Sequence, residues 1–142
     1  MTTRSVQQAI RIRAKPSEVW SSLVAPAKLA RWMGGTQVDS TWEPGSAMTF
    51  TWTVRGRPLR DRGTVLACEP ARLLRYNHWS VISRLPDSDE TRTVITLTLT
   101  PEGDETSLEV SHENLASDEA FGHARFFWRN ALPDVKNIVE RA

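Results

Sequence analysis

Residues 117–142 read SDEAFGHARFFWRNALPDVKNIVERA, and this stretch decides how the rest of the chain is interpreted. Apolar residues recur in it at three- and four-residue steps, which predicts an amphipathic helix with one broad buried face. A helix of this length needs a surface to cover that face, since each large apolar side chain contributes roughly 1.5–3 kcal/mol when buried. The predicted stripe consists of Phe121, Ala124, Trp128, Leu132, Val135 and Val139, widened by Phe127, Ala131 and Ile138.

The start and the interior of this helix carry local signals. Ser117 is a suitable N-cap, and Asp118 and Glu119 place negative charge in the first turn, where the helix dipole favours it. Pro133 lacks a backbone N–H and crowds the carbonyl four residues earlier. We therefore expect a single helix that bends near residues 129–132, with two separate helices as the alternative.

The remaining chain predicts the sheet that this helix covers. Alternating apolar and polar residues predict a first strand, and prolines then open two short helices, the second of which ends at a glycine pair. Six more alternating segments follow, separated by turn-forming residues. Strands joined by tight turns imply an antiparallel sheet with helices on one face, an α+β fold class. The expected elements are strand 5–13, helices 16–24 and 26–33, and strands 36–42, 47–55, 59–69, 72–80, 91–100 and 106–113.

Length and composition predict one ordinary globular domain over residues 1–142. The formal net charge is +1, and no apolar run approaches the ~20 residues that a membrane helix needs. The first residues lack the apolar core of a secretion signal, and the single cysteine, Cys68, excludes an internal disulfide. We expect a cytoplasmic protein that binds no membrane, and the sequence leaves open whether two copies pair.

Several short stretches, taken in this order, resemble one protein superfamily. They are AKPSEVW at 14–20, LARW at 29–32, GTVLACEPARLL at 63–74, TLTLTPEGDET at 96–106, and LEVSH at 108–112, followed by Trp128 and Leu132. The set is similar to the helix-grip superfamily, also called START/Bet v 1-like or SRPBCC. Within it, the chain resembles the family named for homology to the activator of the heat-shock-protein ATPase.

The resemblance implies a curved sheet of six to seven strands that grips the last helix, with a hydrophobic cavity between them. The helix would contribute Phe121, Arg125, Trp128 and Leu132 to that cavity. The strands would contribute Met48, Phe50, Trp52, Val54, Tyr76, His78, Ile95, Leu97, Leu99, Val110 and His112. His78 departs from relatives, which often carry a large aromatic residue there, and makes the cavity wall more polar.

A subset of these positions forms the expected ligand-binding site. His78 can hydrogen-bond a ligand or move a proton near neutral pH, although a structural hydrogen bond explains a strand histidine equally well. For His112 the structural role, near the start of the last helix, is favoured over ligand contact. The expected site residues are Phe50, Trp52, Tyr76, His78, Leu97, His112, Arg125 and Trp128.

Other chemistries find no support in the sequence. Three scattered histidines and one cysteine show no metal-ligand spacing, and no nucleotide or cofactor fingerprint is present. Asp61 lies among arginines and is interpreted as one half of an ion pair on a hairpin. The basic segment 55–62 lacks interleaved aromatics, so we expect no nucleic-acid binding. We assign no metal, no cofactor and no catalytic residue.

Three functions remain open. The first is binding of a small hydrophobic or aromatic molecule in the cavity. The second is an enzyme of the polyketide cyclase, aromatase or dehydratase type, in which His78 or Tyr76 transfers protons. The third, implied only by the family name, is a partner module that stimulates a chaperone ATPase. Fold alone does not separate them, since one fold hosts many activities.

Overall fold

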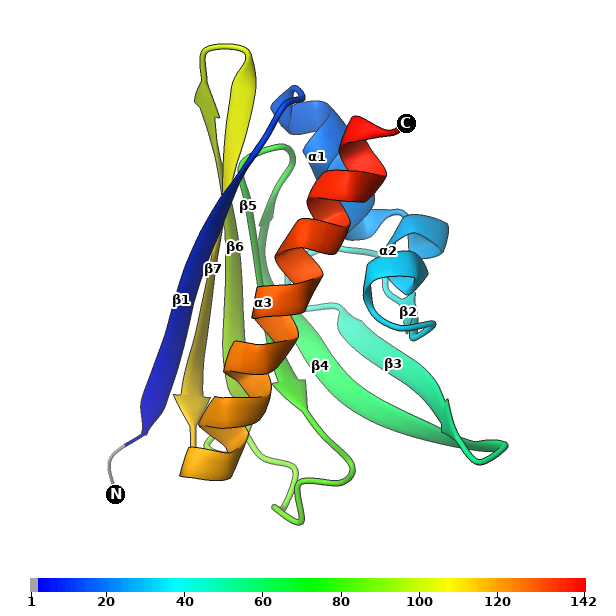
Figure 1. The fold of residues 1–142 in the computed structure, drawn as a ribbon. Helices are drawn as coiled ribbons and strands as arrows, with labels where there is room; N and C mark the ends of the chain where they lie inside the picture. Colours follow the sequence, from blue (N-terminus) through cyan, green and yellow to red (C-terminus); the bar gives the residue numbers. More distant parts are fainter. Residues whose placement is uncertain (1–2) are drawn as a thin grey trace.

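The computed structural model describes residues 3–142, which form one seven-stranded sheet and three helices (Figure 1). Residues 1 and 2 of the single domain expected over 1–142 lie outside the described part. In chain order the elements are β1 (Arg4–Ile12), α1 (Pro16–Val24), α2 (Pro26–Trp32), β2 (Gln37–Asp39), β3 (Ala47–Val54), β4 (Arg57–Glu69), β5 (Leu73–Trp79), β6 (Thr93–Glu102), β7 (Glu105–Leu115) and α3 (Asp118–Glu140).

The sheet is antiparallel throughout, with the strand order β1-β7-β6-β5-β4-β3-β2. Strands β2 to β7 pair with their neighbours in sequence, whereas β1 pairs with the last strand because α1 and α2 carry the chain across the sheet. Figure 1 shows the sheet curving around α3, with α1 and α2 beside the C-terminal half of that helix. This is the helix-grip arrangement, and the predicted fold class is confirmed.

Strand alternation places one apolar face of the sheet against α3, as predicted. The buried side chains on that face come from all seven strands, and β2 contributes Val38. Val54 departs from the expected inward set: it is 42% exposed, because it lies at the end of β3 beyond the reach of α3. The buried apolar set is Val6, Ile12, Val38, Met48, Phe50, Val65, Leu74, Tyr76, Ile95, Leu97, Leu99, Leu108, Val110 and Leu115.

Helix α3 is one continuous helix, and the alternative of two helices is wrong. Ser117 is the N-cap: its hydroxyl accepts a hydrogen bond from the N–H of Ala120 at 3.0 Å, as expected. Phe127 is 37% exposed rather than buried, because it lies at the edge of the stripe. The fully buried stripe is Ala124, Trp128, Ala131, Leu132, Val135 and Val139.

Strand boundaries differ from prediction mainly at the turns. The expected strand 36–42 shrinks to Gln37–Asp39, because Trp42 adopts a left-handed φ of 64° and its N–H bonds to the Ser40 hydroxyl at 3.0 Å. Between β3 and β4 the chain reverses in only two residues, Arg55 and Gly56, both with positive φ. Such a short reversal extends the pairing of the flanking strands.

Gly63 in β4 is required by close contact rather than by backbone conformation. A Cβ at this position would lie 2.3 Å from the carbonyl oxygen of Asn77 in β5 and 3.2 Å from the ring of Phe50. The backbone oxygen cannot move aside without breaking the β4–β5 pairing. In α3, by contrast, a Cβ at Gly122 would meet no other atom within 4 Å.

We predict that Gly63→Ala lowers the free energy of unfolding by about 2–3 kcal/mol, the cost of overpacking a closed site. Gly122→Ala is the matched control and should raise it by about 0.5–1 kcal/mol, since alanine favours the helix. Urea denaturation followed by circular dichroism measures both. Equal stability of Gly63→Ala and the unaltered protein would contradict the contact.

Candidate functional site

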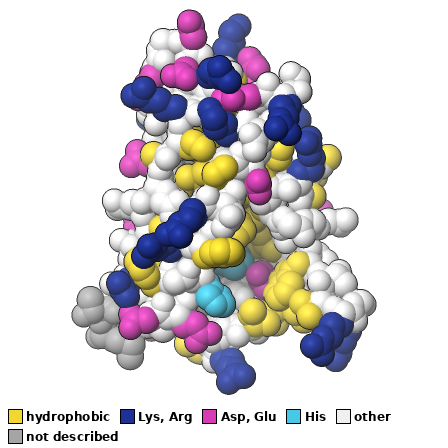
Figure 2. Space-filling view, viewed as in Figure 1, with side chains coloured by type: hydrophobic (Ala, Val, Ile, Leu, Met, Phe, Trp, Pro, Cys, Tyr) yellow, Lys and Arg dark blue, Asp and Glu magenta, His cyan; other side chains and the backbone are white. Residues whose placement is uncertain are grey.

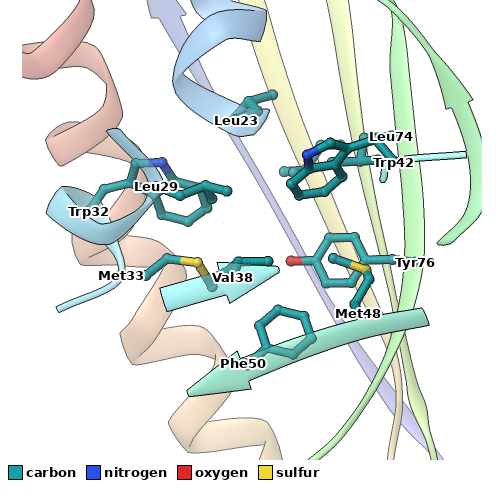
Figure 3. Close-up of a pocket in the computed structure, with 11 residues that line it drawn as sticks. Leu23, Leu29, Trp32, Met33, Val38, Trp42, Met48, Phe50, Leu74 and Tyr76 are labelled. Atoms are coloured by element: carbon teal, nitrogen blue, oxygen red, sulfur yellow. The ribbon is translucent and has the colours of Figure 1, made fainter. Parts of the chain in front are cut away.

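The space directly between the sheet and the helices is almost filled. Phe50, Tyr76 and Leu97 are expected from the sequence to line a ligand cavity, but the void that they border measures only about 10 Å³. That is room for about one water molecule. Figure 3 shows Phe50, Tyr76 and Val38 from the sheet together with Leu29 from α2 around this void. In this structure these aromatic and apolar residues contact one another as core residues.

An open groove lies instead along the side of α3. It measures about 610 Å³ and runs between α3 and the residues that follow α2. Figure 2 shows a hollow beside α3 in which hydrophobic, histidine and acidic side chains lie together. Phe126 and Phe127 on this side are 67% and 37% exposed. The groove is lined by Trp32, Met33, Gly34, His123, Phe126, Phe127, Asn130, Ala131 and Asp134.

Asp61 and His78 form a carboxylate–imidazole pair on the inner face of the sheet. Asp61 Oδ2 lies 2.9 Å from His78 Nε2, and Asp61 Oδ1 accepts a hydrogen bond from the N–H of Val81 at 3.0 Å. The ring of Phe50 packs edge-on against His78, with 4.9 Å between the ring centroids. The side chains of Asp61 and His78 are 11% and 24% exposed, so solvent reaches the pair from one side.

The Asp61 carboxylate is held in its charged form. Burial alone would raise its pKa, but the hydrogen bonds from His78 and Val81, together with the His78 charge, outweigh burial and lower the pKa below its usual value. The nearby indole N–H of Trp52 lowers it slightly further, although Trp52 does not reach hydrogen-bonding geometry. Asp61 is therefore a fixed negative charge beside an imidazole.

His112 and Trp128 connect the sheet to α3. Trp128 Nε1 donates to His112 Nδ1 at 3.0 Å, so the ring hydrogen of neutral His112 is assigned to Nε2. Burial, and secondarily the charge of His78, lower the pKa of His112 to about 4. The expected structural hydrogen bond exists, but its partner lies in the middle of α3 rather than near its start. His112 is thus a neutral, fixed donor.

Two buried N–H groups on this face have no hydrogen-bond partner among residues 3–142: Trp52 Nε1 and His112 Nε2. An unsatisfied buried donor costs about 1–3 kcal/mol, so native structures contain few of them. Trp52, Asp61, His78 and His112, which we call the polar cluster, therefore combine one fixed negative charge with two donors that lack acceptors.

The structure separates the expected site residues into three groups. Trp52, His78 and His112 join the polar cluster, and Trp128 supports it, whereas Phe50, Tyr76 and Leu97 belong to the core. Arg125 is wrong as an inward residue, because it is exposed and adjoins the buried Ala124 on the helix surface. Only its backbone oxygen is used in a contact with the sheet, accepting from Gln8 Nε2 at 3.1 Å.

Asp61 is the residue that sequence reasoning missed. The arginines around it favour an ion pair on an exposed hairpin, but Asp61 is 8% exposed and faces inward. Its register partner in β3 is Phe50, and Phe50 points to the core, so Asp61 shares that face. The signal is present in β4 itself, because strand alternation places Asp61 and Gly63 on the same face as the buried Val65.

Metal and membrane chemistry gain no support from the geometry. Within residues 3–142, no three His, Cys, Asp or Glu side chains are grouped so that they hold a metal ion. None of the helices in that same part of the chain combines the length and apolar character that a bilayer crossing requires. Burial raises the pKa of the Cys68 thiol, which disfavours the reactive thiolate.

Comparison with known proteins gives a family and several similar folds. The family model described as activator of Hsp90 ATPase homolog 1-like protein matches residues 13–140. The solution structure of ChR145 from Cytophaga hutchinsonii is 29% identical, with a TM-score of 0.84 over 99% of this chain and 97% of that one. A search of curated proteins finds no match.

Two crystal structures share the fold at lower identity. Protein MLL2253 from Mesorhizobium loti is 24% identical, with a TM-score of 0.82 over 98% of both chains. CalU16 from Micromonospora echinospora is 24% identical, with a TM-score of 0.73 over 96% of this chain and 76% of that one. Together with the family model, they support the helix-grip superfamily that the sequence motifs indicated.

His112 predicts a pH dependence of stability. Because its pKa falls from 6.5 in the unfolded chain to about 4 in the folded one, only the unfolded state takes up this proton between those values. We predict that the free energy of unfolding decreases as pH falls from 6.5 to 4, by up to about 3 kcal/mol. Urea titrations at half-unit pH steps measure the slope.

The matched variants are His112→Gln, which keeps an acceptor for Trp128, and His123→Gln on the exposed side of α3. The first should flatten the slope between pH 6.5 and 4.5, and the second should leave it unchanged. The carboxylates with lowered pKa, Asp61, Asp87 and Glu140, contribute mainly below that window. If plots of the free energy of unfolding against pH are parallel for His112→Gln and the unaltered protein, His112 is not the source of the pH dependence.

Proposed function

The chain belongs to the activator of Hsp90 ATPase homolog 1-like family, within the helix-grip superfamily, and on that premise we propose that it binds a small hydrophobic or aromatic molecule. The proposed site is the groove along α3, continued inward to the polar cluster. The observation that carries this proposal is an open, mostly apolar groove whose wall residue Phe127 packs against Trp128, the hydrogen-bond donor to His112.

The size and lining of the groove support a ligand of modest size. Pockets for small molecules measure about 300–1,000 Å³ and combine apolar walls with a few convergent polar groups. The groove, at about 610 Å³, falls in that range. Its walls include two exposed phenylalanines, Phe126 and Phe127, and exposed large apolar side chains that lie together mark binding surfaces.

A continuous set of aromatic contacts joins the groove to the polar cluster. Phe127 packs edge-on against Trp128 with 4.8 Å between the ring centroids, and the ring centroids of Trp32 and Trp128 lie 6.1 Å apart. Trp128 in turn donates its hydrogen bond to His112. These contacts link the groove wall to His112 through Trp128, which supports binding at this place rather than at an unrelated patch.

We predict that N-phenyl-1-naphthylamine, a neutral probe that fluoresces in apolar surroundings, binds in this groove. Phe127→Asp should weaken its binding at least about tenfold, because the variant places a charge in the apolar wall. Leu66→Asp is the control, since Leu66 is similarly exposed at 42% but does not line the groove. Fluorescence titration measures both affinities, and circular dichroism confirms that both variants fold.

Binding should also raise the unfolding temperature, since a ligand at 100 times its dissociation constant stabilises by about 2.7 kcal/mol. Equal probe affinity of Phe127→Asp and Leu66→Asp would show that the probe does not bind in the groove. Native mass spectrometry of the purified protein provides an independent check for a retained small molecule.

The Asp61–His78 pair supports a second candidate function, proton transfer to or from the bound molecule. An imidazole held by a charged carboxylate is a typical general base, and His78 lies 2.9 Å from Asp61. Tyr76, the other residue considered for this role, is poorly suited because burial raises its pKa well above the usual value.

An enzyme of this kind would catalyse exchange of acidic C–H protons. We predict that deuterium from solvent enters the α-position of 2-tetralone faster with the protein than in buffer, and that His78→Ala removes the acceleration while probe binding persists. Proton NMR follows the loss of the α-proton signal. Exchange at the buffer rate would leave binding alone as the function.

A further inference from the structure

We infer that the ligand carries an uncharged carbonyl oxygen that accepts a hydrogen bond from His112 Nε2, so that the site prefers aromatic ketones to the matching carboxylates. The inference rests on the proposed function and specifies the ligand class for the same site. Three features of the polar cluster lead to it: a fixed donor, a fixed negative charge, and His78 as the one ionisable hydrogen-bond partner of that charge within residues 3–142.

The donor is fixed by the residue on the other side of the ring. Because His112 Nδ1 accepts from Trp128 Nε1, the neutral ring carries its hydrogen on Nε2 and cannot present an acceptor there. That Nε2 atom is buried and unpartnered among the described residues. A ligand that satisfies it must offer an acceptor, and burial of His112 disfavours a second ring proton that would attract an anion.

The negative charge on the same face of the sheet discourages an anionic acceptor. Asp61 is ionised, and among residues 3–142 its one ionisable hydrogen-bond partner is His78. Whichever form His78 takes, the pair carries a net charge of minus one or zero, so it offers a carboxylate ligand no excess positive charge. Arg125, the one cation expected here from the sequence, is exposed and makes only a backbone contact with the sheet.

Trp52 strengthens the preference for an oxygen acceptor. Its Nε1 is a second buried donor without a partner among residues 3–142, and it lies near Asp61 on the same face. Indole nitrogen donates and never accepts, so this group also calls for an acceptor. A carbonyl oxygen accepts a hydrogen bond without bringing a second negative charge to the face that carries Asp61.

Three naphthalene probes that share one ring system test the inference by isothermal titration calorimetry at pH 7.5. They are 2-acetylnaphthalene, 2-naphthoate and unsubstituted naphthalene. We expect 2-acetylnaphthalene to bind at least about tenfold more tightly than either of the others, since it alone offers the donor an acceptor without adding charge. Equal or tighter binding of 2-naphthoate overturns the preference for an uncharged acceptor.

The role of His112 is tested directly in the unaltered protein by ¹⁵N NMR of its ring nitrogens. The Nε2 resonance should move on addition of 2-acetylnaphthalene and stay in place with naphthalene. If the Nε2 resonance moves with neither probe although binding is measured, the inference is overturned while the proposed function stands. If none of the three probes binds, both the inference and the proposed function fail.

A variant pair gives an independent readout. His112→Phe removes the donor and should reduce the affinity ratio of 2-acetylnaphthalene to naphthalene to about one, whereas Leu66→Phe, at an exposed position outside both the groove and the polar cluster, should keep the ratio. An unchanged ratio in His112→Phe overturns the inference. If His112→Phe does not fold, because Trp128 loses its acceptor, the NMR measurement on the unaltered protein tests the role of His112 by itself.

Discussion

The contact between Trp128 and the sheet is the one on which the rest of the structure depends. Trp128 is almost fully buried at the middle of α3, and its indole nitrogen donates to His112 in β7. This bond sets the distance of the helix from the sheet and also fixes the hydrogen of His112 on Nε2. The same interaction therefore anchors the fold and determines the polarity of the candidate site.

The space inside the fold is filled by core side chains, and the open space lies beside α3. Several large aromatic side chains, among them Phe50, Tyr76 and Trp128, are buried between the sheet and the helices and fill the space there. The void there shrinks to about 10 Å³, while the groove beside α3 remains open at about 610 Å³. Well-packed cores stabilise, so the available space lies where packing ends, at Phe126 and Phe127.

The fold followed from the sequence because it depends on periodicity, which is local. The stripe from Ala124 to Val139, the Ser117 cap and the strand alternation all have direct physical signatures. The site did not follow as readily, because it depends on which strands lie side by side and how far they curve. Asp61 was hidden by the arginines around it, and Arg125 was misplaced by about one position on the helix surface.

The polar cluster contains two buried donors that have no acceptor among residues 3–142. Such groups cost free energy, and under the proposed function a bound ligand would offset that cost by providing an acceptor. The most direct test is a search for intermolecular nuclear Overhauser effects between 2-acetylnaphthalene and the protein. We predict contacts from the naphthalene ring to Phe127 and Met33 and from the acetyl methyl to Trp52 or His112. Contacts confined to the outer face of the sheet, or to the β5–β6 loop, would contradict it.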